Sequence, residues 1–168
     1  RDQLLGRLAH RGLQEFSSGY NLVIHDEPRA TTATVRAAAA RLRVQHGGVR
    51  AIYVDYLQIL ADPGEPEHIR VGRISRELKA IAREFDVPVI AMSQLNRLSE
   101  SREDRRPRLS DLRDSGAIEQ DADIVLGLFR PRLNSADMSI LVLKNRHGRA
   151  GDEVSLFFDL DSVSVGDE

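Results

Sequence analysis

The decapeptide AIYVDYLQIL, residues 51–60, places an acidic residue directly behind a short apolar run. A short apolar run bounded by turn signals is typical of a strand that is buried on both faces. A carboxylate at the end of such a strand is costly unless something pairs with it. Asp55 therefore suggests Mg²⁺ held through water, as in phosphate-handling folds, although a lone Asp at a strand end is more often a cap or turn former.

The segments on either side of this stretch predict an α/β fold. Strands and helices alternate, with continuous apolar runs, which is the pattern of a mostly parallel sheet with helices on both faces. Thr31 or Thr32 can cap the first helix of the alternation, and Gly47 can stop it. The expected elements are a helix at 4–13, a strand at 21–24, a helix at 34–46, a strand ending at Asp55, a helix at 74–85 and a strand at 87–93.

The last third of the chain predicts antiparallel strands at the carboxyl-terminal edge of the sheet. A short helix is expected at 117–121, and the segment HGRAG at 147–151 suits the turn of a hairpin. Strands are expected at 123–129, 140–146 and 154–160.

A second candidate site residue follows the strand expected at 87–93. Open α/β sheets bind ligands at the carboxyl ends of their parallel strands, so Asp55 and Gln94 are expected to project into the same crevice. Gln94 could donate a hydrogen bond to a terminal phosphate or orient its attacking water. An amide that satisfies loop backbone is an equally good interpretation.

Two cationic residues stand near the end of a later strand. Lys144 and Arg146 are two residues apart, so on a strand their side chains emerge on the same face. Such a pair can stabilise the charge on a transferring phosphoryl group, and a neighbouring subunit can supply it. The alternative is a pair of solvated surface residues.

Residues 96–114 form a long polar stretch that we expect to be a functional loop or disordered, because it is too charged for a core. Its six arginines and five acidic residues leave a net charge of only about one positive, and it has no aromatic residue for base stacking. At its end, in SDLRDSG, Arg113 can reach a phosphate and Gly116 allows close backbone approach to a ligand. A capping turn is the rival interpretation.

Composition excludes several classes of site. The chain has 168 residues, which fits one domain, and 24 basic against 26 acidic residues give a net charge of -2. DNA binding would therefore be local. The sequence contains no cysteine, so thiolate metal sites and cysteine nucleophiles are excluded, and its five histidines lack ligand spacing. No apolar run approaches the roughly 20 residues that span a bilayer, and we expect a cytoplasmic protein.

Four segments together resemble the DnaB family of replicative DNA helicases, whose motor is a RecA-like ATPase domain. Their order and spacing match as well, and the resemblance covers most of the chain from residue 21 onward. The segments are VDYLQIL at 54–60, VPVIAMSQLNR at 87–97, RPRLSDLRDSGAIEQDADIVLGLFR at 106–130 and LKNRHGRAG at 143–151.

The resemblance implies a nucleotide site. Asp55 matches the Walker B aspartate that holds hydrated Mg²⁺, and Gln94 matches the residue that senses the γ-phosphate of ATP. Lys144 and Arg146 match residues that act in trans, at the nucleotide site of the adjacent subunit in a hexameric ring.

The resemblance also implies partners. Arg113, Asp114 and Gly116 match the loop that lines the central channel and touches the phosphates of single-stranded DNA. A homohexamer, a primase and a helicase loader are the protein partners that it implies. Asp114 stands where a glutamate is usual, and His147 and Arg149 replace a more familiar asparagine and proline.

No GxxxxGK[ST] phosphate loop is present in these residues. We therefore expect residues 1–168 to be one partial RecA-like domain without the Walker A strand and loop, the catalytic glutamate and the family's amino-terminal helical domain. Alone it should not hydrolyse ATP, whereas the resemblance implies that the full protein translocates 5′ to 3′ and unwinds DNA at the fork. The alternatives are another RecA-like recombination or repair ATPase, and a non-catalytic truncated module that binds a helicase or loader.

Overall fold

The computed structural model describes residues 14–17, 21–64, 66–96, 102–112, 115–132, 135–159 and 164–166. The helix expected at 4–13 lies outside these ranges. The elements are β1 (Gln14–Ser17), β2 (Asn21–Ile24), α2 (Thr32–His46), β3 (Ile52–Val54), α3 (Glu67–Phe85), β4 (Val89–Ala91), α4 (Ser115–Asp121), β5 (Ile124–Phe129), β6 (Asp137–Asn145), β7 (Glu153–Asp159) and β8 (Ser164–Gly166), with short 3-10 helices at Leu57–Ile59 and Leu109–Asp111.

Helix α2 begins and ends where its sequence predicts. The Thr31 hydroxyl accepts a hydrogen bond from the Thr34 backbone N–H at 3.3 Å, and the Thr34 hydroxyl accepts one from the Thr31 N–H at 2.9 Å. This reciprocal capping box satisfies two backbone donors that the first turn leaves free. The helix ends at Gly47, whose φ of 78° is left-handed and open to glycine at little cost.

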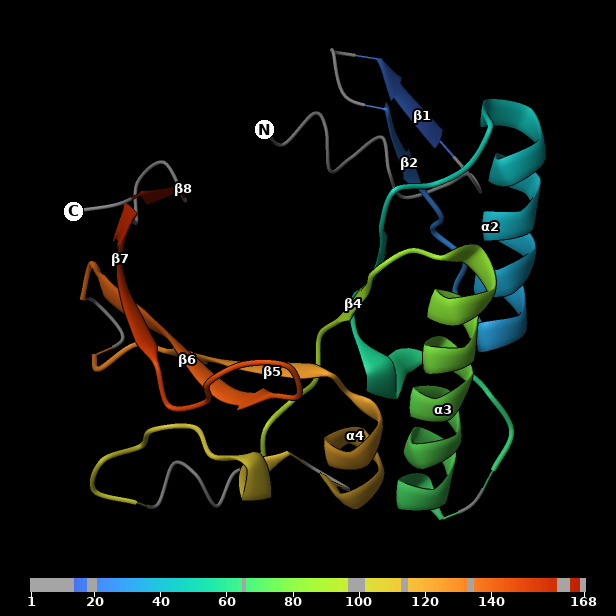
Figure 1. The fold of residues 1–168 in the computed structure, drawn as a ribbon. Helices are drawn as coiled ribbons and strands as arrows, with labels where there is room; N and C mark the ends of the chain where they lie inside the picture. Colours follow the sequence, from blue (N-terminus) through green and yellow to red (C-terminus); the bar gives the residue numbers. More distant parts are fainter. Residues whose placement is uncertain are drawn as a thin grey trace.

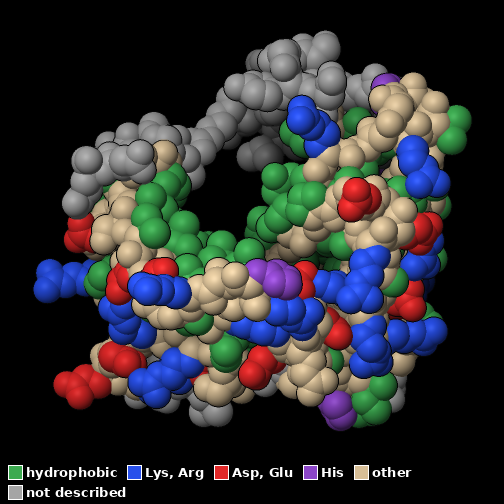
Figure 2. Space-filling view, in the orientation of Figure 1, with side chains coloured by type: hydrophobic (Ala, Val, Ile, Leu, Met, Phe, Trp, Pro, Cys, Tyr) green, Lys and Arg blue, Asp and Glu red, His purple; other side chains and the backbone are tan. Residues whose placement is uncertain are grey.

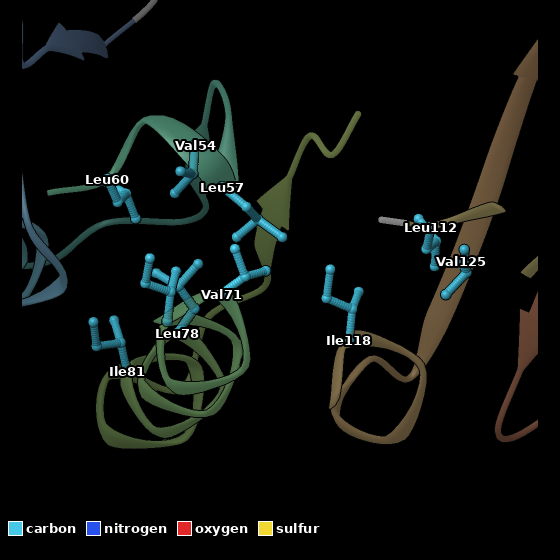
Figure 3. Packing of buried hydrophobic residues seen from close by; sticks show 10 residues of the cluster. Val54, Leu57, Leu60, Val71, Leu78, Ile81, Leu112, Ile118 and Val125 are labelled. Atoms are coloured by element: carbon cyan, nitrogen blue, oxygen red, sulfur yellow. The ribbon is translucent and has the colours of Figure 1, made fainter. Parts of the chain in front are cut away.

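Helix α3 buries one apolar face, on which Val71, Ile74, Leu78 and Ile81 follow helical spacing. Burying a side chain of this size contributes about 1.5–3 kcal/mol. Together with residues from β3, α4 and β5 they form the core of the molecule (Figure 3). Gly72, on the same helix, allows α4 to approach closely, because a Cβ built there would lie 2.9 Å from the Cβ of Ala117.

The described strands form three sheets (Figure 1). β3 and β4 are parallel, with Val54 paired to Ala91, and β5, β6, β7 and β8 form an antiparallel sheet. The expected α/β fold, a parallel sheet with antiparallel strands at the carboxyl-terminal edge, is confirmed. One pairing differs from expectation: β2 pairs with β1 as an antiparallel hairpin, because β1 lies only a few residues away along the chain.

The prediction that residues 96–114 are too charged for a core is wrong for part of the segment. Asp111 is only 4% exposed and Leu112 only 7%. The Asp111 carboxylate accepts hydrogen bonds from Arg102 Nη1 at 2.6 Å and from the Arg108 backbone N–H at 2.8 Å. The hydrogen bond from Arg102 is the main cause that lowers the pKa of the Asp111 carboxyl below its usual value of 3.8. The segment balances its own charge and can therefore be buried.

One face of β5 is buried and the other is exposed. Val125 and Gly127 face the interior, and a Cβ at Gly127 would lie 2.8 Å from Pro107 Cγ. Large apolar side chains are exposed on the opposite face of β5, on β3 and β4, and just after β4, namely Tyr53, Ile90, Met92, Ile124, Leu126 and Leu128. Figure 2 shows hydrophobic side chains lining a hollow between the parallel pair and the antiparallel sheet.

No helix among the described residues combines the length and the hydropathy that a membrane span requires.

Candidate functional site

Asp55 and Gln94 lie at the same edge of the parallel pair, as the sequence predicts. The Met92 N–H donates to the Val54 carbonyl, and the Leu57 N–H donates to the Met92 carbonyl, both at 2.9 Å. These bonds continue the pairing of β3 and β4 past the strand ends, so the chain emerges from both strands side by side. Both side chains are exposed. No hydrogen bond or ion pair joins either of them to another described residue, so both remain available to a ligand.

A second polar pair, Gln58 and Ser93, lies at this edge, and the sequence analysis assigned no role to it. Gln58 Nε2 donates a hydrogen bond to Ser93 Oγ at 3.0 Å. Gln58 Oε1 is buried, and it has no hydrogen-bond partner among the described residues. A buried acceptor without a donor is uncommon, and bound water or a ligand commonly supplies one. The sequence signal was a polar residue inside the apolar 3-10 turn 57–59.

The side-chain oxygen atoms at this edge fit hydrated Mg²⁺ but do not form a complete coordination shell for it. Among the described residues, no group of three or more histidine, aspartate or glutamate side chains could hold a metal ion. Asp55 contributes one exposed carboxylate. Mg²⁺ keeps several waters and is often bound by one or two carboxylates together with substrate phosphates. One carboxylate beside an exposed amide therefore fits the protein's share of the contacts to a magnesium-nucleotide complex.

Lys144 and Arg146 converge on the carboxyl-terminal end of α4. Lys144 Nζ donates to the backbone carbonyls of Glu119 and of Ala122, the latter at 2.7 Å. Arg146 Nη2 donates to the Gln120 carbonyl at 2.6 Å. The last carbonyls of a helix lack intrahelical donors and carry partial negative charge, so cations stabilise them. Both side chains do emerge on one face, although Arg146 lies just beyond the end of β6.

Asp123 links these cations to α3, and the sequence analysis did not single it out. Its carboxylate accepts hydrogen bonds from Arg146 Nη1 at 2.9 Å and from Lys79 Nζ. The hydrogen bond from Lys79 is the main cause that holds the pKa of the Asp123 carboxyl below its usual value, and burial opposes it only in part. The only sequence signal was an acidic residue between α4 and β5.

Of the three residues predicted to touch DNA, Gly116 alone is described. It is exposed near the start of α4, and a Cβ built on it would meet nothing within 4 Å. Packing against the described residues therefore does not require glycine at this position. Arg113 and Asp114 lie outside the described residues.

Residues 6–165 match the family described as DnaB-like helicase C terminal domain. This chain belongs to that family. The "Replicative DNA helicase DnaB" of Pasteurella multocida is 44% identical over 144 residues, which are 81% of this chain and 31% of the relative. The "Replicative DNA helicase DnaC" of Bacillus subtilis is 45% identical over 150 residues, or 84% of this chain and 33% of the relative. The chain thus spans about a third of these relatives.

Solved structures of DnaB-like proteins share the fold. One solved ATPase domain superposes with a TM-score of 0.82 at 35% identity, covering 89% of this chain and 56% of its own. A DnaB-like replicative helicase, solved in a study of its interactions with primase, superposes with a TM-score of 0.81 at 36% identity, covering 88% of this chain and 37% of its own. The RecA-like fold class expected from sequence is confirmed.

Two groups of polar residues therefore stand out in this DnaB-like domain. The strand-edge group consists of Asp55, Gln58, Ser93 and Gln94. The α4-end group consists of Lys79, Asp123, Lys144 and Arg146. Among the residues that the structure places, no hydrogen bond or ion pair joins the two groups.

Proposed function

We propose that this chain is the carboxyl-terminal part of the motor of a replicative helicase, acting in the cytoplasm. The complete protein hydrolyses ATP to translocate 5′ to 3′ along single-stranded DNA and to unwind the duplex at the replication fork. One observation carries the proposal. Asp55 and Gln94 are both exposed at the carboxyl edge of two parallel strands, in a chain of the DnaB-like family.

The strand-edge group is the part of the nucleotide site that this chain contributes. Asp55 would hold hydrated Mg²⁺, and the ion would supply positive charge against the charge that develops on the phosphate oxygens of ATP. Gln94 donates a hydrogen bond to the γ-phosphate or orients the attacking water. The bond between Gln58 and Ser93 fixes the backbone from which Gln94 extends.

Lys144 and Arg146 serve the ATP bound by the adjacent subunit of a homohexamer. Their attachment to α4, with no described bond to Asp55 or Gln94, supports a role in trans. A guanidinium supplied in this way stabilises the negative charge of the phosphoryl-transfer transition state.

The DNA strand passes along the loop before α4. Arg113 reaches a phosphate, and Asp114 and Gly116 complete the contact; among the described residues nothing lies within 4 Å of a Cβ built on Gly116, which leaves room for a DNA backbone. Primase and a helicase loader are the protein partners, and one solved relative was studied for its interactions with primase.

Residues 1–168 form only part of the RecA-like domain. The exposed apolar face of β5, with Leu126 and Leu128 at 55% and 65% exposure, resembles that of a buried strand, and no described residue covers it. We assign the layer that covers it to further segments of the same polypeptide, which include the strand and phosphate loop of the nucleotide site. Alone, the 168 residues should show no ATPase activity, and measurable turnover by this isolated chain would overturn the assignment.

Subunit mixing tests the proposed site in the full-length protein. Asp55→Asn and Arg146→Ala should each lower kcat for ATP by about a thousandfold or more, because each removes a charge from the reacting phosphates. A mixed ring of the two variants should regain activity, since some interfaces combine a wild-type Asp55 with a wild-type Arg146 from the neighbour. Failure of mixed rings to recover activity would contradict the assignment in trans. Retained activity in either variant would remove that residue from the site.

A further inference from the structure

We propose that Asp123, together with the carboxyl-terminal end of α4, positions Arg146 and Lys144 for ATP hydrolysis at the neighbouring site. The inference rests on the proposed function, and it assigns Asp123 as a positioning residue.

The first observation is the number of independent bonds between the cations and α4. Lys144 and Arg146 together donate to the carbonyls of Glu119, Gln120 and Ala122. The backbone is joined as well, since the Arg146 N–H donates to the Asp123 carbonyl at 2.8 Å. A shift of α4 must therefore either carry both cations with it or break several hydrogen bonds.

The second observation is that α4 is held against α3. Ile118 of α4 is 7% exposed in the core, and a Cβ built on Gly72 of α3 would lie 2.9 Å from the Cβ of Ala117. The carbonyls that accept from Arg146 and Lys144 therefore belong to a helix that is itself fixed in the core.

The third observation is that Asp123 joins this end of α4 to α3. Its carboxylate accepts from Lys79 on α3 and from Arg146 beyond β6. α3 is fixed in the core through Ile74 and Ile81, which are 0% exposed. Asp123 therefore ties the Arg146 side chain to α3, in addition to its hydrogen bond to α4. Without the carboxylate, the Arg146 side chain keeps, among the described residues, its hydrogen bond to the Gln120 carbonyl, while its backbone N–H still donates to the Asp123 carbonyl.

The test is steady-state ATP hydrolysis by the full-length protein, with and without a single-stranded oligonucleotide. Asp123→Asn should lower kcat in the presence of DNA by about tenfold or more, because misplacement of a charged group by about 1 Å can cost a hundredfold. KM for ATP and the affinity for the oligonucleotide should each change less than about twofold, since Asp123 contacts neither ligand. Asp152→Asn makes the same charge change on an exposed turn and should match the wild type.

Two further variants separate positioning from folding. Lys79→Met keeps the aliphatic stem but releases Asp123 from α3, and it should also lower kcat. If Asp123→Asn does not fold, the kcat of Lys79→Met is the measurement that tests the proposal. In an Arg146→Ala background, Asp123→Asn should lower the residual kcat less than about twofold, because the two residues act as one unit. Wild-type kcat and DNA stimulation in Asp123→Asn, or in Lys79→Met if the former is unfolded, would overturn the proposal. A full tenfold loss in the Arg146→Ala background would do so too.

These outcomes are distinguishable from failure of the proposed function. If Arg146→Ala retains full ATPase activity, the role in trans is wrong, and Asp123 has no catalytic group to position. If Arg146→Ala is inactive while Asp123→Asn and Lys79→Met behave as wild type, the role in trans stands and only the link through Asp123 fails.

Discussion

The strand-edge group and the α4-end group are both polar, but they satisfy their hydrogen bonds in opposite ways. Asp55 and Gln94 are exposed and make no described hydrogen bond, and Gln58 Oε1 is buried without a described donor. At the end of α4, Arg146 donates hydrogen bonds to the Asp123 carboxylate and to the Gln120 carbonyl, and Lys144 donates to two more carbonyls. The first group leaves hydrogen-bonding capacity unused among the described residues, whereas the second is held in place by hydrogen bonds within the chain.

In the proposed function one domain serves two nucleotide sites, and this difference fits the two roles. A group that binds its own ligand can leave hydrogen-bonding capacity unused until the ligand arrives. A group that acts on a neighbour's ligand must be held in place from within, because the interface forms only on assembly. Cations placed over helix carbonyls achieve this, since the carbonyls accept without neutralising the positive charge.

The largest expected effect concerns Asp55, because its free carboxylate should matter for catalysis and not for folding. Asp55→Asn should lower kcat by about a thousandfold and leave the melting temperature of the full-length apoprotein unchanged, as the carboxylate has no described partner to lose. Differential scanning calorimetry without nucleotide, run beside the ATPase assay, measures both quantities. A lower melting temperature would mean that Asp55 is structural and that the contrast between the groups is wrong.

The next effect concerns the face of β5 that this chain leaves exposed. Leu126→Ala should destabilise the full-length protein by about 2–5 kcal/mol if further segments cover Leu126, although its exposure here is 55%. Val44→Ala is the matched control, because Val44 is 86% exposed on α2. Amide hydrogen exchange of β5 and β6 in the full-length protein gives the change in local free energy. Equal and negligible effects of both substitutions would show that no layer covers β5.

Local signals allowed much of the fold to be predicted. The ends of α2 follow from Thr31 and Gly47, and the hairpin of β6 and β7 follows from the turn at 147–151. Asp55 and Gln94 could be placed together because parallel strands share an edge, a property of the fold class that needs no side-chain detail.

The rest depended on contacts between residues far apart in sequence. Asp123 meets Lys79, which is 44 residues away, and Arg146, which is 23 residues away. No local pattern distinguishes such an Asp from an ordinary residue between a helix and a strand. The burial of Asp111 was missed for a related reason. A segment rich in both acidic and basic residues has the same composition whether its charges are solvated or paired with one another.

A smaller effect on stability is expected at Asp111. Like the α4-end group, this buried carboxylate receives its hydrogen bonds from within the chain. Asp111→Ala should destabilise the full-length protein by about 1–3 kcal/mol, because the substitution leaves buried donors unpaired. The folded-state pKa of Asp111 is lowered, so its contribution is complete above the unfolded value of 3.8 and is lost as the pH falls through the folded value. The difference in unfolding free energy between wild type and variant, measured by urea titration, should therefore shrink on acidification. A difference that grows toward acid pH would contradict the pairing with Arg102.

The smallest effect on stability is expected at Asp123, despite its several bonds. Its side chain is 42% exposed and that of Arg146 is 40%, so water and salt screen the pair. Asp123→Asn should change the free energy of unfolding of the full-length protein by at most about 1 kcal/mol, and less at high salt. Because the pKa of Asp123 is lowered by Lys79, even this contribution should fade as the pH falls below 3.8. Urea titrations at low and high salt, with Asp152→Asn as the control, measure it. A salt-independent loss of several kcal/mol would mean that Asp123 holds the fold together, and a kinetic effect of its substitution could then no longer be assigned to positioning.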